Sequence, residues 1–209
     1  MNRIVPGVAL AVALAGGAAL AQPGKGGPDW PCTQLYDPDL VLAHVWNGPD
    51  PMRLGGHWAA DPLIAPLVPR LASTAVPVER ALAEIDALAE RLPENERASR
   101  LALLVAGLHE VLDAERKKTI EGLYKFGRAQ RKLAQEIRER NDRLLQLRAR
   151  AEASEEAREL EETLQWDLKI FQDRRSTVNT ICAQPDFIEK RLFALAKHIE
   201  AKIGHGRAG

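Results

Sequence analysis

The sequence has little of several residue types that would indicate a specific chemistry. It holds two cysteines, and aromatic side chains make up 5% of its 209 residues. The cysteines form no C-x-x-C or C-x-x-C-H motif, which excludes the usual signatures of a dithiol redox centre and of covalent haem. No serine lies in a G-x-S-x-G elbow, and no glycine loop has the spacing that holds phosphate. We therefore expect no enzymatic activity, no catalytic residue and no cofactor.

An excess of charge of one sign is also lacking. The chain has 29 Lys and Arg residues and 29 Asp and Glu residues. A balanced chain has no overall field that attracts nucleic acid or an anionic membrane surface. We expect neither as a partner.

Long hydrophobic runs are missing except at the N-terminus. A short charged start precedes an apolar stretch over residues 4–20, which Pro6 and the Gly16-Gly17 pair interrupt, and Ala19-x-Ala21 follows the pattern that signal peptidases read. A retained membrane anchor, the alternative, normally needs about 20 uninterrupted apolar residues. The pattern predicts a signal peptide over residues 1–21, export to the periplasm, and no integral membrane span after cleavage.

Export gives the two cysteines a structural role. Disulfides persist outside the cytosol and are rare within it. We therefore predict one bridge between Cys32 and Cys182, which would close a loop of about 150 residues and contribute about 4 to 5 kcal/mol in the chain-entropy model. A redox-active or metal-binding pair of thiols is the alternative.

Residues 22–72 are rich in proline and tryptophan. The prolines recur too often for a long helix or a central strand. The segment nevertheless carries Trp30, Trp46 and Trp58, and large rings bury well. The composition predicts an irregular arm laid across a helical body, with short helical pieces near residues 39–45 and 61–72. The three tryptophans are our candidate interaction surface.

Helix-forming residues dominate the rest of the chain. Apolar residues recur at helical spacing between Pro77 and Pro93, and a wider apolar stretch around residues 101–112 is typical of a helix buried on several sides. A further amphipathic helix is expected after Pro185. We predict an all-α fold in which residues 77–127 and 183–204 form a helical bundle. Gly122 and Gly127 predict a bend or a close helix contact at its edge.

Residues 128–181 have the pattern of an antiparallel coiled-coil hairpin that projects from the bundle. Leucines at heptad spacing mark a narrow seam on both limbs, and on the first limb the polar residue Arg140 occupies one seam position. Ser154 and the acidic residues after it favour a new helix start between the limbs. The first limb is basic and the second is acidic, so folding one onto the other pairs opposite charges.

Two short motifs carry a family resemblance. They are "DWPC" at residues 29–32 and a C-x-x-P from Cys182 to Pro185, followed by an amphipathic terminal helix. In both, the chain resembles a group of exported helical proteins of Gram-negative bacteria to which no activity is attached. The resemblance implies an exported location and a paired-cysteine architecture.

These features favour a periplasmic interaction or scaffold protein that docks another envelope component through its hairpin or its aromatic arm. A narrow hairpin cannot enclose a ligand pocket of about 300 Å³ or more. A holdase-type chaperone is one alternative, and the paired charges along the limbs count against it. A metal-binding or enzyme accessory protein is another. It would need a pocket around Trp46, His57 and Trp58, or a zinc site built from His44, His57 and a carboxylate, for which there is no local motif.

Overall fold

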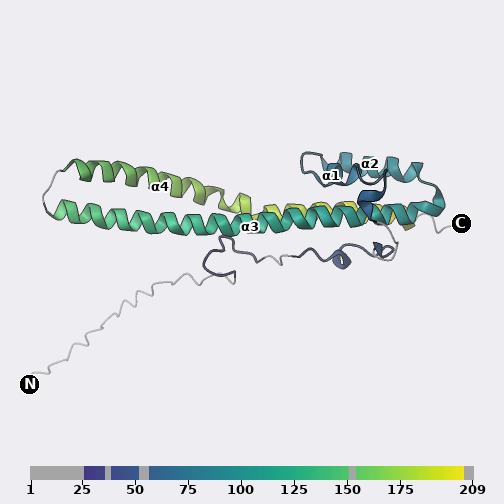
Figure 1. Ribbon diagram of the computed structural model, residues 1–209, viewed down its shortest axis with the longest axis horizontal. Coiled ribbons are helices and arrows are strands. Elements are labelled where there is room, and N and C mark those ends of the chain that lie inside the picture. The colour runs from purple at the N-terminus through teal and green to yellow at the C-terminus, as the bar shows by residue number, and fades with distance from the viewer. Residues whose placement is uncertain (1–25, 36–38, 52–56, 151–153, 205–209) are drawn as a thin grey trace, which may run out of the picture.

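The computed structural model describes residues 26–35, 39–51, 57–150 and 154–204, and every regular element in these ranges is a helix (Figure 1). The all-α prediction is thus confirmed. The predicted signal peptide, residues 1–21, lies outside the described residues. The elements are the 3-10 turns η1 (Leu42–His44) and η3 (Trp58–Ala60) and the helices α1 (Leu67–Ala72), α2 (Val78–Arg91), α3 (Glu94–Ala149), α4 (Glu155–Cys182) and α5 (Gln184–Gly204).

The molecule is elongated because α3 runs along its whole length (Figure 1). This helix has 56 residues, which corresponds to about 84 Å at a rise of 1.5 Å per residue. Helices α4 and α5 follow one another back along α3, while α1 packs on α3 and α2 on α5. One end of the molecule is therefore a bundle and the other is the α3–α4 hairpin.

A proline sets the boundary between α2 and α3. Leu92, which precedes Pro93, has an extended backbone with ψ 134°, because the ring of a proline disfavours the helical region for the residue before it. Helix α2 therefore ends, and α3 begins directly after Pro93. Helix α5 begins at Gln184, before Pro185 rather than after it as expected, since a proline is tolerated in a first turn.

The hydrophobic core lies in the bundle. Side chains from α1, α2, α3 and α5 meet there, among them Leu71, Ile85, Leu104 and Leu195, which are fully buried. Leu40, Val45 and Trp46 extend the same core into the N-terminal arm. The arm is thus part of the folded body.

Arg191 is a charged side chain inside this core, with 6% of its surface exposed. Its Nε and Nη2 donate hydrogen bonds of 2.8 and 2.7 Å to the carbonyl oxygen of Leu71, in the last turn of α1. The last carbonyls of a helix have no partner within the helix, so Arg191 satisfies one of them. Burial lowers the pKa of the Arg191 guanidinium, and Glu115 acts against this shift.

Gly127 allows a close contact between α3 and the arm. A Cβ atom at this position would lie 1.8 Å from the carbonyl oxygen of Asp29, whereas a Cβ atom at Gly122 would meet nothing within 4 Å. Helix α3 continues through both glycines without a break. The close contact expected here is therefore made by the irregular arm and not by another helix.

Candidate functional site

A leucine seam holds the α3–α4 hairpin together. Leu133, Leu144 and Leu147 of α3 and Leu164 of α4 are buried between the limbs. The amide of Gln130 adds a hydrogen bond of 3.0 Å from its Nε2 to the carbonyl oxygen of Phe171. Apolar burial therefore continues along the hairpin as a narrow stripe, as in a coiled coil.

Opposite charges pair across this seam. Arg140 Nη1 lies 2.6 Å from Asp167 Oδ2, so the polar residue of the seam has a partner on the other limb. Two further pairs join Arg143 to Glu156 at 2.8 Å and Arg148 to Glu161 at 2.9 Å. Exposed pairs of this kind contribute only about 0.2 to 1 kcal/mol each. Their main effect is to select which limb packs on which.

Ser154 starts the second limb. Its side-chain oxygen accepts a hydrogen bond of 3.2 Å from the backbone N–H of Ala157. Glu155 and Glu156 lie in the first turn, where the partial positive charge of the helix end stabilises carboxylates. These local signals explain why α4 begins immediately after the tip.

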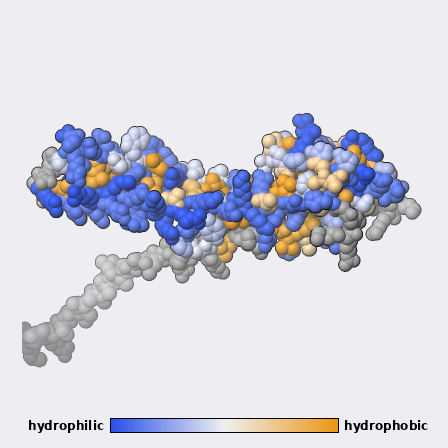
Figure 2. All heavy atoms as spheres, viewed as in Figure 1, coloured by the Kyte–Doolittle hydropathy of each residue, from blue (hydrophilic) through white to orange (hydrophobic). Residues whose placement is uncertain are grey.

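The outer face of α4 includes Glu159, Glu162, Trp166 and Ile170, which recur at the three- and four-residue spacing of one helix face. Trp166 is 66% exposed and Ile170 is 41% exposed. The face of the hairpin that Figure 2 shows is mostly hydrophilic. A tryptophan that points away from the seam contributes nothing to the hairpin core, so another reason for its position is needed.

Sequence reasoning missed Trp166, because it concentrated on the tryptophans of the arm. The signal was present in the heptad pattern. Leu160 and Leu164 define the seam, and a residue two positions after Leu164 falls on the opposite side of a helix with 3.6 residues per turn. The sequence alone therefore identifies Trp166, a large aromatic side chain opposite the seam, as a candidate interaction residue.

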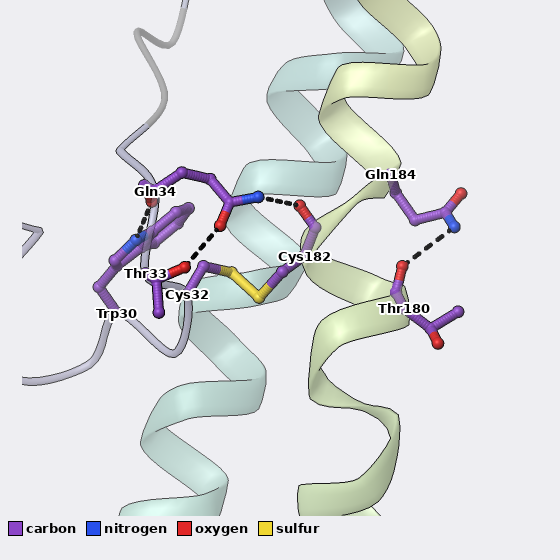
Figure 3. The surroundings of a disulfide bond; sticks show 7 residues. All are labelled: Trp30, Cys32, Thr33, Gln34, Thr180, Cys182 and Gln184. Atoms are coloured by element: carbon purple, nitrogen blue, oxygen red, sulfur yellow. Dashed lines mark hydrogen bonds between the residues drawn. A yellow bond between two sulfur atoms is a disulfide. The ribbon is translucent and has the colours of Figure 1, made fainter.

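The base of the hairpin is tied to the arm by a disulfide. Cys32 and Cys182 are bonded to each other, with a Cα–Cα distance of 5.7 Å, and both are buried. Gln34 Nε2 donates a hydrogen bond of 3.5 Å to the carbonyl oxygen of Cys182, next to the bridge (Figure 3). The arm thus crosses the molecule where α4 ends.

Asp29 and Trp30 strengthen this joint. Asp29 Oδ1 lies 2.6 Å from Arg131 Nη2 of α3. Trp30 packs on Tyr124 with ring centroids 4.9 Å apart, and its Nε1 donates to the carbonyl oxygen of Gln34 at 2.7 Å. Asp29 and Trp30 of the "DWPC" motif therefore attach the arm to α3, while Cys32 attaches it to α4.

The other two predicted tryptophans also pack against the body. Trp46 is 6% exposed and belongs to the core, so it offers little surface to a partner. Trp58 is half-buried against Gly107 of α3, and its Nε1 donates a hydrogen bond of 2.8 Å to Glu110 Oε2. The structure does not bring Trp30, Trp46 and Trp58 together into one surface patch: they anchor three separate points of the arm.

A hollow of about 420 Å³ lies beside Trp58, between the arm and α3. Its polar groups already bind protein partners: His57 and Trp58 contact Glu110, and Asp113 accepts the N–H of Leu40. The Nε2 of His109 contacts the carbonyl oxygen of Leu40. The lining consists of Leu42, Pro51, His57, Trp58, Ala106, His109, Glu110 and Asp113.

Within the described ranges, no three His, Cys, Asp or Glu side chains lie close enough together to hold a metal ion. His44 ends η1, while His57 lies 3.7 Å from Glu110. In the same part of the chain, no helix is long and apolar enough to cross a membrane.

Comparisons with protein-family models, with curated proteins and with solved structures found no match to this chain.

Proposed function

We propose that this protein is an exported adapter without enzymatic activity, which docks another protein of the bacterial envelope through its α3–α4 hairpin. The observation that carries this proposal is the exposed Trp166 on the outer face of α4. Tryptophan is enriched among the residues that dominate binding energy at protein interfaces. An exposed tryptophan on a mostly hydrophilic limb therefore supports a docking role.

The disulfide supports the exported location, because such bridges persist in oxidising compartments. The periplasm is the compartment that we propose. The signal peptide predicted over residues 1–21 would deliver the chain there. The arm, held at three tryptophans and one disulfide, would then keep the hairpin in a fixed orientation.

A site-specific crosslink tests the adapter function. The photoreactive residue p-benzoylphenylalanine would replace Trp166 in the full chain, produced and exported in its native host. Asp142, which is exposed on the other limb, provides the matched control position. We expect position 166 to form an adduct with one exported protein, identified by mass spectrometry, and position 142 to form none. No adduct from position 166, or equal adducts from both positions, would contradict the proposal.

The hollow beside Trp58 favours a second candidate, an accessory protein that binds a small organic ligand. Its volume of about 420 Å³ lies in the usual range for such sites. Native mass spectrometry of the protein purified from its own compartment would detect a retained ligand or ion. We expect any such ligand to be lost from Trp58→Ala, while a bare polypeptide mass would count against this candidate.

The holdase alternative has less support. Among the described residues, the exposed large apolar side chains are spread over the arm, α3, α4 and α5, whereas gripping an unfolded client would need them gathered on one surface. Failure of the purified protein to suppress client aggregation would distinguish the adapter from a chaperone.

A further inference from the structure

The outer face of α4 combines two uncompensated carboxylates with two exposed apolar side chains. Several neighbouring carboxylates are paired: Glu155 with Arg158, Glu156 with Arg143 and Glu161 with Arg148. Glu159 and Glu162 are exposed, and among the described residues they form no such ion pair. On the same stripe, Glu159 lies two turns before Trp166 and Glu162 lies one turn before it. From Glu159 to Ile170 the stripe therefore has negative charge at one end and apolar surface at the other, and the Lys169–Asp173 ion pair lies next to its apolar end.

We propose that the outer face of α4 binds a basic amphipathic helix of the partner protein. This inference rests on the adapter function proposed above and adds the chemistry of the partner. A helix lying along α4 would place apolar side chains against Trp166 and Ile170 and Lys or Arg side chains beside Glu159 and Glu162. The indole of Trp166 also attracts an Arg or Lys cation to its face. An acidic partner would place like charges together at Glu159 and Glu162.

A second copy of this chain fits the stripe less well. The exposed side of its basic limb also carries Glu139 and Asp142. In a second copy, the exposed Lys132 and Arg138 of that limb would attract Glu159 and Glu162, whereas Glu139 and Asp142 would repel them. A separate helix that carries only basic side chains beside its apolar ones would face the two carboxylates without this repulsion and is the better occupant.

The test uses the full-length oxidised protein and two synthetic peptides. Both peptides repeat leucine at the spacing of one helix face, one with lysine and the other with glutamate at the remaining positions. Fluorescence anisotropy of the labelled peptides measures binding. We expect the lysine peptide to bind about tenfold or more tightly than the glutamate peptide, and to bind more weakly above about 0.15 M salt because charges are screened. Equal binding of both peptides would overturn the proposal.

Matched variants locate the binding face. E159K/E162K and W166A should each weaken binding of the lysine peptide about tenfold. E139K/D142K makes the same change of net charge on α3, and L145A removes a leucine that is 56% exposed; both should bind within about twofold of wild type. All these positions are exposed, and circular dichroism checks that the helices are retained. A loss as large in E139K/D142K as in E159K/E162K would overturn the proposal.

Two further readouts separate this inference from the adapter function. Sequencing of the adduct formed at position 166 should identify a partner segment with net positive charge. An acidic or neutral segment would overturn the basic-helix inference and leave the adapter function intact. Sedimentation should show that W166A does not change the oligomeric state. A wild-type dimer that W166A dissociates would assign the face to a second copy and overturn the inference.

Discussion

At the scale of single residues, Gly127 controls how closely the arm approaches α3. A Cβ atom there would lie 1.8 Å from the carbonyl oxygen of Asp29, so Gly127→Ala must push the arm backbone away and should cost about 1 to 3 kcal/mol of unfolding free energy. Gly122→Ala is the matched control, because its Cβ meets nothing within 4 Å; it should gain about 0.5 to 1 kcal/mol. Urea unfolding measures both, and equal effects would contradict the close contact.

Asp113 gives the attachment of the arm a dependence on pH. Burial alone would raise the pKa of Asp113, but the N–H of Leu40 and the ammonium group of Lys117 outweigh it, so the pKa lies below its ordinary value. A carboxyl with a lower pKa in the folded state stabilises the protein above the unfolded pKa of about 3.9, and this stabilisation is lost as the pH falls through the folded pKa. When the pH is lowered from 7 to about 3, the unfolding free energy of the Asp113→Asn variant should therefore fall less than that of wild type. Urea unfolding at a series of pH values measures the unfolding free energy of both proteins. The same loss with falling pH in wild type and in Asp113→Asn would contradict the prediction.

The structural role of a residue could be predicted from the sequence where its partners are close along the chain. It could not be predicted where the partners are distant. Ser154 as a helix cap follows from its neighbours along the chain. The contact of Gly127 with Asp29 joins positions far apart in the sequence, and no periodicity reports it. The same applies to Arg191, whose partner at Leu71 lies on another helix.

At the scale of elements, we predict that the hairpin seam accommodates Arg140 because Arg140 pairs with Asp167. Asp167→Leu leaves Arg140 without its 2.6 Å partner and should cost about 1 kcal/mol. Arg140→Leu/Asp167→Leu removes both charges and extends the leucine seam, so the double variant should be more stable than the Asp167→Leu single variant. A double-mutant cycle in urea gives the coupling energy, and strictly additive effects would contradict the pairing.

The sequence predicted the helical elements better than the course of the arm. Heptad leucines and prolines define α2, α3 and α4 because these signals act over one or two turns. The piece expected over residues 61–72 shortens to α1 at Leu67–Ala72, and the path of the arm depends on tertiary contacts such as Trp46 in the core. The outer face of α4 could also have been predicted, because the heptad pattern identifies the positions that do not face the seam.

At the scale of the whole molecule, the disulfide links two residues 150 positions apart. Opening so large a loop increases the entropy of the unfolded chain, so Cys32→Ser/Cys182→Ser should lose about 4 to 5 kcal/mol of unfolding free energy. A reductant should destabilise wild type and leave the double variant unchanged. If the reductant had no effect on the wild-type urea midpoint, the bridge would contribute nothing to stability.

Helix α3 belongs to both ends of the molecule, and no loop separates its bundle half from its hairpin half. Long helices curve only gently unless a proline or an inserted group kinks them, and there is no proline between Glu94 and Ala149. A load applied at the hairpin tip is therefore carried along a single rod to the bundle. The molecule is therefore a stiff rod, and anything attached at its two ends would be held at a fixed spacing.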